Sequence, residues 1–340
     1  MPLFLQPVFQ ERIWGGTALK SFNYDIPNEY TGECWGISAH PNGPNIIENG
    51  KHKGKTLEAV WNEDKALFGE TGDTKFPLLT KILDANDKLS VQVHPNDEYA
   101  QKYEGEYGKT ECWYILDAQE DAEIIYDVNA KNQGELNEMI DRQQFDTLFK
   151  TVKVQAGDFF YVPAGTVHAI GKGIMILETQ QSSDTTYRIY DYDRVDKDGN
   201  KRDLHLEQSK AVIHLSEDSP NTTPIHENIQ GQQYTQFVSN DFFTVERWVI
   251  DGNLNYRKPH DYCLVSIVEG SGQITVDGSD YSLNKGTHFI LTTEDDEIQF
   301  NGDMTMIVSH VKIRRGEMNL ICHKANWFCL CLFLYIIKIN

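Results

Sequence analysis

Short apolar runs of strand length recur along the chain, separated by clusters of turn residues. Within the runs, apolar side chains either alternate with polar ones or fill consecutive positions, as in half-buried and fully buried β-strands. Glycine, proline, asparagine and aspartate stand between the runs, where the chain is expected to turn. The strands predicted from this pattern in the first half cover residues 76–83, 89–94, 112–116, 123–126, 159–162 and 174–178.

Helical periodicity is confined to a few stretches. In residues 56–68, Thr56 can cap a helix whose apolar residues share one face. Residues 134–149 show a similar pattern that fits two short helices, and residues 206–215 form a third stretch. Strands dominate and helices are insertions, so we predict a mainly β fold, a roll or sandwich with helical insertions.

The C-terminal half repeats this character. Residues 286–291 echo residues 157–162, but without the Pro-Ala-Gly turn and the histidine that follow the earlier segment. We therefore predict a second roll that copies the first but lacks this turn and histidine, and that, unlike the first, binds no metal. Its predicted strands cover residues 243–250, 263–269, 272–276, 288–291 and 305–311.

The predicted domain limits follow from composition. A metal-binding catalytic domain with helical insertions covers residues 1–215, and a polar, proline-containing linker covers 216–231. The second, metal-free β domain covers 232–311, and an atypical apolar tail covers 312–340. The tail contains an uncharged run at 327–337 that is well short of the about 20 residues needed to cross a bilayer, and we assign it no function.

Charge and cysteine usage narrow the possible partners. The formal net charge of -20 argues against nucleic acid and against anionic membranes, but not against a small phosphorylated substrate. No basic and apolar leader opens the sequence, and Cys34, Cys112 and Cys263 stand singly inside strand-like segments as expected core residues. We predict a cytoplasmic protein, and the sequence does not indicate its protein partners.

Four side chains could together bind a divalent metal. Gln92 and His94 are two residues apart on a predicted strand, so both point to the same face. Glu111 opens another strand, and His168 follows the Pro-Ala-Gly turn. Two imidazoles, a carboxylate and an amide oxygen suit a single metal with room for water or substrate, which predicts a mononuclear metal enzyme.

Residues 157–168 fit the second motif of the cupin superfamily: a glycine, five residues, Pro-x-Gly, two residues and a histidine. The first cupin motif normally carries His-x-His with a glutamate four or five residues later. This chain instead has Gln92-x-His94, and its glutamate follows only at Glu111. Gln-x-His-Pro, Lys-x-Glu, Pro-Ala-Gly-x-x-His and a downstream arginine, in this order, resemble the type I mannose-6-phosphate isomerase family. Residues 13–16 and 32–38 support the resemblance, which covers residues 1–311 and is closest to the short bacterial form.

The resemblance implies a cupin-type β-roll or jelly-roll sandwich, and one zinc ion per chain bound by Gln92, His94, Glu111 and His168. It also implies a sugar-phosphate substrate, with mannose 6-phosphate and fructose 6-phosphate interconverted through an enediol intermediate. A metal acting as Lewis acid would stabilise the negative charge that develops on the sugar oxygens.

The reaction needs a base, and the favoured candidate is Glu178. The family pattern has a glutamate there and an arginine ten residues later, here Arg188. The alternative is that Glu178 only orients a ligand or water. Asp184 or a metal-bound hydroxide would then be the better candidate.

The phosphate and the enediolate both need cations, and the sequence offers several. The family positions favour Lys109 and Arg188 as catalytic or substrate-binding residues. Lys81 lies among apolar neighbours, where a charge is costly unless paired, and Ser90 shares the inward face of Gln92. Three further residues remain ambiguous or unfavoured: Trp14 belongs either to the pocket rim or to the core, and His205 and His214 lie in a polar, helical context that argues against ligation.

Two other functions remain open. His94, Glu111 and His168 could form the iron site of a cupin dioxygenase, although Gln92 and the pair of cations argue against it. A catalytically silent cupin that binds sugar phosphates is the other alternative, and binding without turnover would support it.

Overall fold

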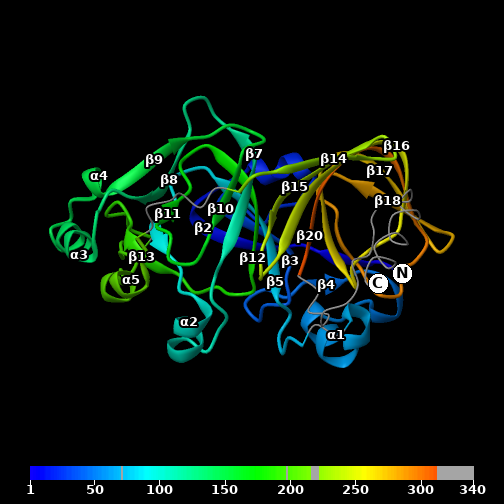
Figure 1. The fold of residues 1–340 in the computed structure, drawn as a ribbon, viewed down its shortest axis with the longest axis horizontal. Coiled ribbons are helices and arrows are strands. Elements are labelled where there is room, and N and C mark those ends of the chain that lie inside the picture. Colours follow the sequence, from blue (N-terminus) through cyan, green and yellow to red (C-terminus); the bar gives the residue numbers. More distant parts are fainter. Residues whose placement is uncertain (70–71, 197, 216–221, 312–340) are drawn as a thin grey trace, which may run out of the picture.

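The structure, a computed structural model, describes residues 1–69, 72–196, 198–215 and 222–311. Its strands form three antiparallel sheets of nine, six and five strands, and Figure 1 shows them in two lobes that lie side by side. The predicted mainly β fold with helical insertions is confirmed. Among the described residues, no helix combines the length and the hydropathy that a bilayer crossing requires.

The six-stranded and five-stranded sheets enclose the core of the first lobe. The first has the order β10-β7-β12-β5-β3-β2 and the second the order β13-β6-β11-β8-β9. Apolar side chains from both sheets, such as Ile176 and Ile124, belong to one buried cluster. The strands are β2 (Val8–Gly16), β3 (Thr31–Ile37), β5 (Leu78–Ala85), β6 (Val91–Val93), β7 (Glu111–Ala118), β8 (Glu123–Val128), β9 (Phe149–Lys153), β10 (Phe159–Val162), β11 (His168–Ala169), β12 (Ile174–Gln181) and β13 (Tyr187–Tyr190).

Strand β12 is buried on both faces, and its alternating side chains belong to two different cores. Ile176 lies in the interior of the first lobe, whereas Leu177 packs in a cluster shared with the second lobe. Because successive strand residues point to opposite faces, Glu178 points into the first lobe like Ile176. The strand register places Trp113 and Lys81 directly opposite Glu178, on the same inner face. Polar side chains at one end of this face therefore meet inside the roll.

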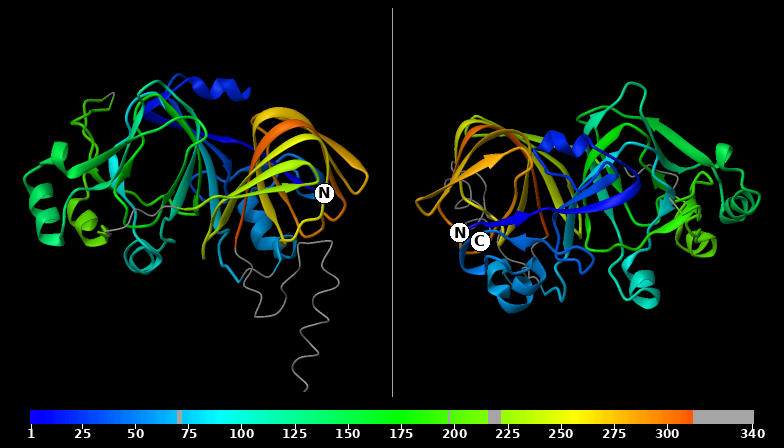
Figure 2. Two further views of the ribbon diagram at one scale, coloured as in Figure 1. Left: turned by 45° about the horizontal axis from the view of Figure 1, so that its top comes forward. Right: turned by 180° about the vertical axis from the view of Figure 1, so that it is seen from behind.

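The second lobe is built on the nine-stranded sheet, which curls on itself (Figure 2). The N-terminal strand belongs to this sheet, since β1 pairs with β19 on one side and with β4 on the other. The first strand of the chain therefore belongs to the second lobe, although the next strand, β2, belongs to the first lobe. The strands are β1 (Leu3–Gln6), β4 (Ile46–Ile47), β14 (Ile225–Ile229), β15 (Gln232–Ser239), β16 (Thr244–Tyr256), β17 (Cys263–Val276), β18 (Ser279–Asn284), β19 (His288–Leu291) and β20 (Ile298–His310).

Local differences from the sequence-based expectations have identifiable causes. Residues 225–229 of the predicted linker form β14, which pairs with β15 along its whole length. The strands predicted at 263–269 and 272–276 are one strand, β17. Gly270 adopts φ +74° beside a shift in the pairing register, so it bends the strand without ending it. Residues 216–221 and the predicted tail at 312–340 lie outside the described residues, and the domain limits remain a prediction.

The predicted helices are present, and the first begins where its cap was expected. Thr56 Oγ1 accepts a hydrogen bond from the backbone N–H of Ala59 (3.1 Å), at the start of α1 (Leu57–Glu63). The stretch at 134–149 is indeed two helices. The predicted elements are α1, followed by the 3-10 turn η3 (Lys65–Phe68), then α3 (Gln133–Asp141), α4 (Phe145–Leu148) and α5 (Leu206–Val212).

Three short helical elements were not predicted: α2 (Asp97–Tyr103) and the 3-10 turns η1 (Ala18–Phe22) and η2 (Gly50–His52). In α2 the buried residue is Ala100, so the helix carries no apolar stripe for a periodic pattern to reveal. Its cap was nevertheless visible, because Asn96 accepts a hydrogen bond from the N–H of Tyr99 (3.0 Å).

The two lobes are in close contact where Gly36 meets His288. A Cβ atom at Gly36 would lie 2.4 to 2.6 Å from three atoms of the His288 ring. The ring is held on both sides, because its Nδ1 lies 2.8 Å from Ser266 Oγ and its Nε2 lies 2.7 Å from Tyr24 Oη. The ring therefore cannot easily move aside, and the contact requires glycine.

We predict that Gly36→Ala destabilises the protein. The new methyl group would force either the β3 backbone or the His288 ring to shift, and overpacking of this kind typically costs about 1–3 kcal/mol. The free energy of unfolding in urea measures the effect. In a His288→Ala background the same change should cost much less, and an unchanged cost there would show that the two residues do not meet as described.

Candidate active site

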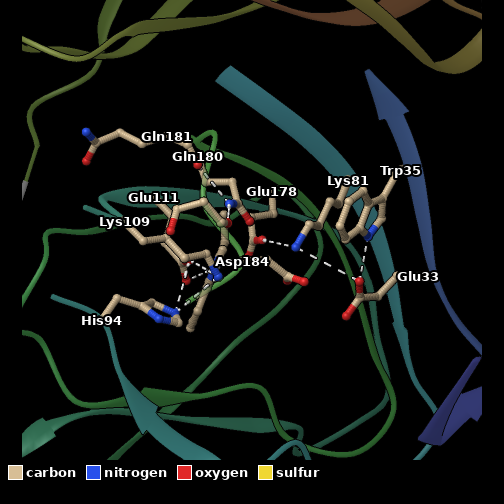
Figure 3. Close-up of polar contacts among 12 residues, drawn as sticks. Glu33, Trp35, Lys81, His94, Lys109, Glu111, Glu178, Gln180, Gln181 and Asp184 are labelled. Carbon is tan, nitrogen blue, oxygen red and sulfur yellow. Dashed lines mark hydrogen bonds and ion pairs between the residues drawn. The ribbon is translucent and has the colours of Figure 1, made fainter. Parts of the chain in front are cut away.

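Charged and polar side chains gather inside the first lobe, at one end of its core. They come from β3, β5, β7 and β12 of the six-stranded sheet and from β6 and β11 of the facing sheet. Figure 3 shows several of them converging. The group consists of Glu33, Lys81, Gln92, His94, Lys109, Glu111, His168 and Glu178.

Two histidines present the same ring nitrogen to the centre of this group. His94 follows β6, and its Nδ1 lies 2.9 Å from the carbonyl oxygen of Thr185. His168 opens β11, and its Nδ1 lies 2.9 Å from the carbonyl oxygen of Thr166. Because a carbonyl can only accept, each Nδ1 carries the proton and each Nε2 keeps a free lone pair. This is the tautomer that metal-binding histidines use.

The environment keeps both rings neutral. Burial lowers the pKa of His94 well below its usual value, and the nearby Lys109 lowers it further. Burial also lowers the pKa of His168 to about 4. Neutral imidazoles are available as ligands without losing a proton first.

Glu111 completes a set that fits a metal ion. Its Oε1 lies 3.4 Å from His168 Nε2, and its Oε2 lies 3.5 Å from His94 Nε2. The possible ligand atoms of these three buried residues all lie within 4.8 Å of one another. Glu111 Oε2 is buried, and the cation beside it among the described residues is Lys109, whose Nζ lies 3.0 Å away. A carboxylate facing the lone pairs of two neutral imidazoles could hold a divalent metal, and the donor set suits zinc.

Gln92 lies beside this set, as the sequence predicted. It stands directly opposite His168 in the β6–β11 pairing, and its Nε2 lies 3.3 Å from His168 Nε2. Rotating the carboxamide by half a turn would present its oxygen to the same point. Gln92 can therefore supply the fourth ligand.

Trp113 connects Glu111 to Glu178. Its indole Nε1 lies 3.0 Å from Glu111 Oε1 and 3.1 Å from Glu178 Oε2, so one N–H is shared between two carboxylates. Burial raises the pKa of Glu178, and the negative charge of Glu111 raises it further. A carboxylate with a raised pKa holds a proton more readily, which suits a group that receives and returns one.

The two predicted lysines both lie inside the roll beside acidic side chains. Burial alone would lower the pKa of Lys109, but Glu111 and Glu178 outweigh it and raise the pKa above its usual value. Lys109 Nζ lies 3.0 Å from Glu111 Oε2 and 3.2 Å from His94 Nε2. Lys81 Nζ lies 3.9 Å from Glu178 Oε1 and 4.0 Å from Glu33 Oε2. Dashed lines mark both contacts in Figure 3.

The sequence analysis missed Glu33, which anchors the far side of this network. Arg12 binds it with two nitrogens, Nε at 2.9 Å and Nη2 at 3.1 Å, and Trp35 Nε1 donates to its Oε2 at 2.6 Å. Burial alone would raise the pKa of Glu33, but Lys81 and Arg12 lower it to about 2. The spacing of Glu33 and Trp35 on one strand is the signal that identified Gln92 and His94, and it could have indicated this pair as well.

Arg188 and Ser90 lie together near the cluster. Arg188 stands opposite Gln92 in the β13–β6 pairing, so both share one face of the sheet. Its Nε donates to Ser90 Oγ (3.3 Å), and its Nη1 donates to the carbonyl oxygen of Asp203 (2.8 Å). The guanidinium is half-buried beside the cluster and remains available to a ligand.

Other candidate residues lie outside the cluster. Trp14 is only 4% exposed and belongs to the apolar core with Leu83 and Leu89, a position that favours its core alternative over the pocket rim. His205 Nδ1 accepts a hydrogen bond from the N–H of Arg188 (3.2 Å), and His214 is not among the clustered side chains. The three predicted core cysteines, Cys34, Cys112 and Cys263, are buried free thiols.

Comparisons with known proteins agree across most of the chain. The family model for the catalytic domain of type I phosphomannose isomerase matches residues 3–133, and the model for the mannose-6-phosphate isomerase cupin domain matches residues 233–311. The mannose-6-phosphate isomerase of Streptococcus mutans is 54% identical over 310 residues, which cover 91% of this chain and 98% of that protein. ManA of Bacillus subtilis, also named a mannose-6-phosphate isomerase, is 51% identical over 311 residues, covering 91% and 99%.

Solved structures support the fold. The mannose 6-phosphate isomerase from Bacillus subtilis superposes with a TM-score of 0.89 at 45% identity, over 91% of this chain and 99% of that one. A variant of the phosphomannose isomerase from Salmonella typhimurium shares the fold with a TM-score of 0.76 at 17% identity, over 92% and 100%. The predicted cupin-type fold is thereby confirmed.

The ion pairs of Glu33 generate a prediction about pH. Its pKa is depressed in the folded protein, so its stabilising contribution is complete above its ordinary pKa of 4.5 and is lost as the pH falls toward about 2. Glu33→Gln should therefore cost about 3 kcal/mol of unfolding free energy near pH 7, with order-of-magnitude precision. The difference from wild type should shrink as the pH falls below about 4.5.

Urea unfolding, carried down to the lowest pH at which the native state is populated, measures this difference. A gap between the two proteins that stays constant across this range would contradict the ion-pair assignment of Glu33.

Proposed function

Because the chain belongs to the type I phosphomannose isomerase family, we propose that it interconverts mannose 6-phosphate and fructose 6-phosphate with one zinc ion per chain. The observation that carries the proposal is the buried set of His94, Glu111 and His168, in which both imidazoles direct Nε2 toward one carboxylate. Relatives that are 54% and 51% identical along the chain are named mannose-6-phosphate isomerases.

In this proposal the metal is held by the Nε2 atoms of His94 and His168, by the Glu111 carboxylate and by the carboxamide oxygen of Gln92. When bound, zinc supplies a Lewis acid without redox chemistry, which stabilises negative charge on the sugar oxygens as a proton leaves carbon. The tautomers of the two histidines support this assignment, because each Nδ1 is bound to a backbone carbonyl and each unprotonated Nε2 faces the Glu111 carboxylate.

Glu178 is the proposed base that carries the proton between C2 and C1. It is 3% exposed, and burial together with the negative charge of Glu111 raises its pKa, which makes it a stronger base. Lys81, at 3.9 Å, would stabilise the carboxylate after it releases the proton. Asp184 is less suited, because its Oδ2 already accepts a hydrogen bond from Asn42 Nδ2 (2.9 Å) at an exposed position.

Lys109 and Arg188 are the cations proposed to balance the phosphate and the negative charge of the enediolate. Lys109 lies against Glu111 and His94, so in this proposal it would face the sugar oxygens that the metal holds. Arg188 extends the same face beyond Gln92, and Ser90 orients its guanidinium. A planar guanidinium can bind two oxygens of one phosphate or of one enediolate at once.

Family membership favours the isomerase over the cupin dioxygenase. The non-catalytic alternative is decided by measuring turnover. A cytoplasmic location and one zinc per chain stay predictions.

We predict that the purified protein forms fructose 6-phosphate from mannose 6-phosphate and loses this activity after chelation. Removing the metal leaves the negative charge on the sugar oxygens without its strongest stabiliser. A coupled assay for fructose 6-phosphate, run before chelation, after chelation and after adding zinc back, measures the effect. Tight binding of mannose 6-phosphate without turnover in the zinc-loaded protein would support the non-catalytic alternative instead.

His168→Ala removes one proposed ligand and leaves the rest of the chain unchanged. This variant should lose zinc, as measured by elemental analysis, and should also lose the zinc-dependent activity of the wild type. His214→Ala removes a histidine outside the cluster and should keep both. Full zinc content in His168→Ala would remove that residue from the metal site.

We further predict that Glu178→Gln keeps zinc and sugar-phosphate binding but loses turnover. The substitution is nearly isosteric and removes the proposed proton acceptor, and loss of a general base typically lowers rates by roughly a hundred- to ten-thousandfold. The rate at which C2 of mannose 6-phosphate takes up deuterium from heavy water, followed by NMR, should fall together with the isomerisation rate. Normal C2 exchange in the variant would show that Glu178 only orients its neighbours.

A further inference from the structure

A carboxylate outside the metal cluster, Glu106, organises the turn that connects β12 to β13. Glu106 lies in the segment between α2 and β7, and its side chain is 27% exposed. Its Oε2 accepts hydrogen bonds from Ser183 Oγ (3.1 Å), from the backbone N–H of Asp184 (3.2 Å) and from Thr185 Oγ1 (3.1 Å). One oxygen therefore binds three consecutive residues of the turn.

The other oxygen of Glu106 is bound by a histidine from a distant part of the sequence. Its Oε1 lies 3.2 Å from His40 Nε2. The backbone N–H of Asn42 donates to His40 Nδ1 (3.2 Å), so the ring proton sits on Nε2 and points at Glu106. Burial alone would raise the pKa of Glu106, but the N–H of Asp184 and the His40 ring outweigh it and lower the pKa. Glu106 is thus an anion with four donors around it.

The turn bound by Glu106 supplies the carbonyl that orients His94. Thr185 Oγ1 contacts Glu106, and its carbonyl oxygen accepts a hydrogen bond from the Nδ1–H of His94 (2.9 Å). Strand β12 ends at Gln181 and β13 begins at Tyr187, so residues 182–186 lie outside both strands. The position of the Thr185 carbonyl therefore depends on the side-chain contacts of the turn.

We propose that Glu106 is a positioning residue for the metal site. By fixing the Thr185 carbonyl, it fixes the tautomer and the rotation of the His94 imidazole, and so increases the affinity of the site for zinc. The consequence for zinc rests on the proposed function, in which His94 is a ligand, whereas the effect on the His94 ring does not. Loss of the partner that orients a metal-binding histidine typically lowers metal affinity by about 10–100-fold.

Glu106→Gln tests this without a large change in shape. The carboxamide keeps one oxygen, but its NH₂ group faces donors where the carboxylate offered an acceptor. The zinc dissociation constant, measured by competition with a chromophoric chelator, should rise by about 10–100-fold. Glu106→Asp keeps the charge on a shorter side chain and should fall between the wild type and Glu106→Gln.

Glu104→Gln is the matched control. Glu104 lies two residues earlier, and its Oε1 accepts from Tyr187 Oη (2.6 Å), which belongs to β13 rather than to the turn. Its zinc affinity should stay within about twofold of wild type, since it does not touch the Thr185 carbonyl. Equal losses in the two variants would overturn the proposal, because they would reflect general loosening of the segment.

A second readout reports on His94 without zinc. In protein labelled with ¹⁵N at histidine, the Nδ1 proton of His94 should exchange with solvent faster in Glu106→Gln than in wild type. The Nδ1 proton of His168, which is bound to Thr166, should be unaffected and serves as an internal reference. If the wild type binds no zinc, the proposed function fails, and this measurement still decides the role of Glu106. Unchanged exchange at His94 in the folded variant would overturn it.

Discussion

The site depends on one constraint: charges buried inside the first roll must neutralise one another. Three carboxylates, Glu33, Glu111 and Glu178, share this interior with Lys81 and Lys109, and the partly exposed Arg12 pairs with Glu33. An isolated ionised group would be very costly there, so each one is stable only because an opposite charge lies within about 4 Å. A divalent metal adds two positive charges and a sugar phosphate adds nearly two negative ones. The network can therefore accept metal and substrate together without a large net charge in the core.

Strand geometry makes this arrangement possible. Inner-face residues of β12, β7 and β5 lie opposite one another in register, so Glu178, Trp113 and Lys81 form a row across the sheet. The outer face of the same strands packs on the second lobe. That sheet is consequently packed on both faces, and Glu111, Glu178 and Lys81 are held by its backbone pairing. His94 differs, because it follows β6 in the facing sheet and its ring orientation depends on the turn that Glu106 binds.

The site residues that were predicted from the sequence are those that a short local pattern can indicate. Alternation on a strand identified Gln92 and His94, a turn motif identified His168, and a glutamate at the start of a strand identified Glu111. The alternation of Glu33 and Trp35 was open to the same reading, but the contact of Glu33 with Lys81 was not, because it depends on how β3 aligns with β5.

The predicted fold shows the same division between local and long-range information. Individual strands and helices were visible as local patterns. The joining of β1 to β19 was not, because this pairing spans nearly the whole chain.

The central claim is that one zinc ion lies between His94, Glu111 and His168, and diffraction measured on both sides of the zinc absorption edge tests it most directly. An anomalous peak about 2.0–2.2 Å from the two Nε2 atoms and from a Glu111 oxygen is the predicted result. The Gln92 carboxamide should lie next to the same peak. A zinc-loaded, active crystal whose anomalous peak lies elsewhere, or whose histidines bind the metal through Nδ1, would contradict the account.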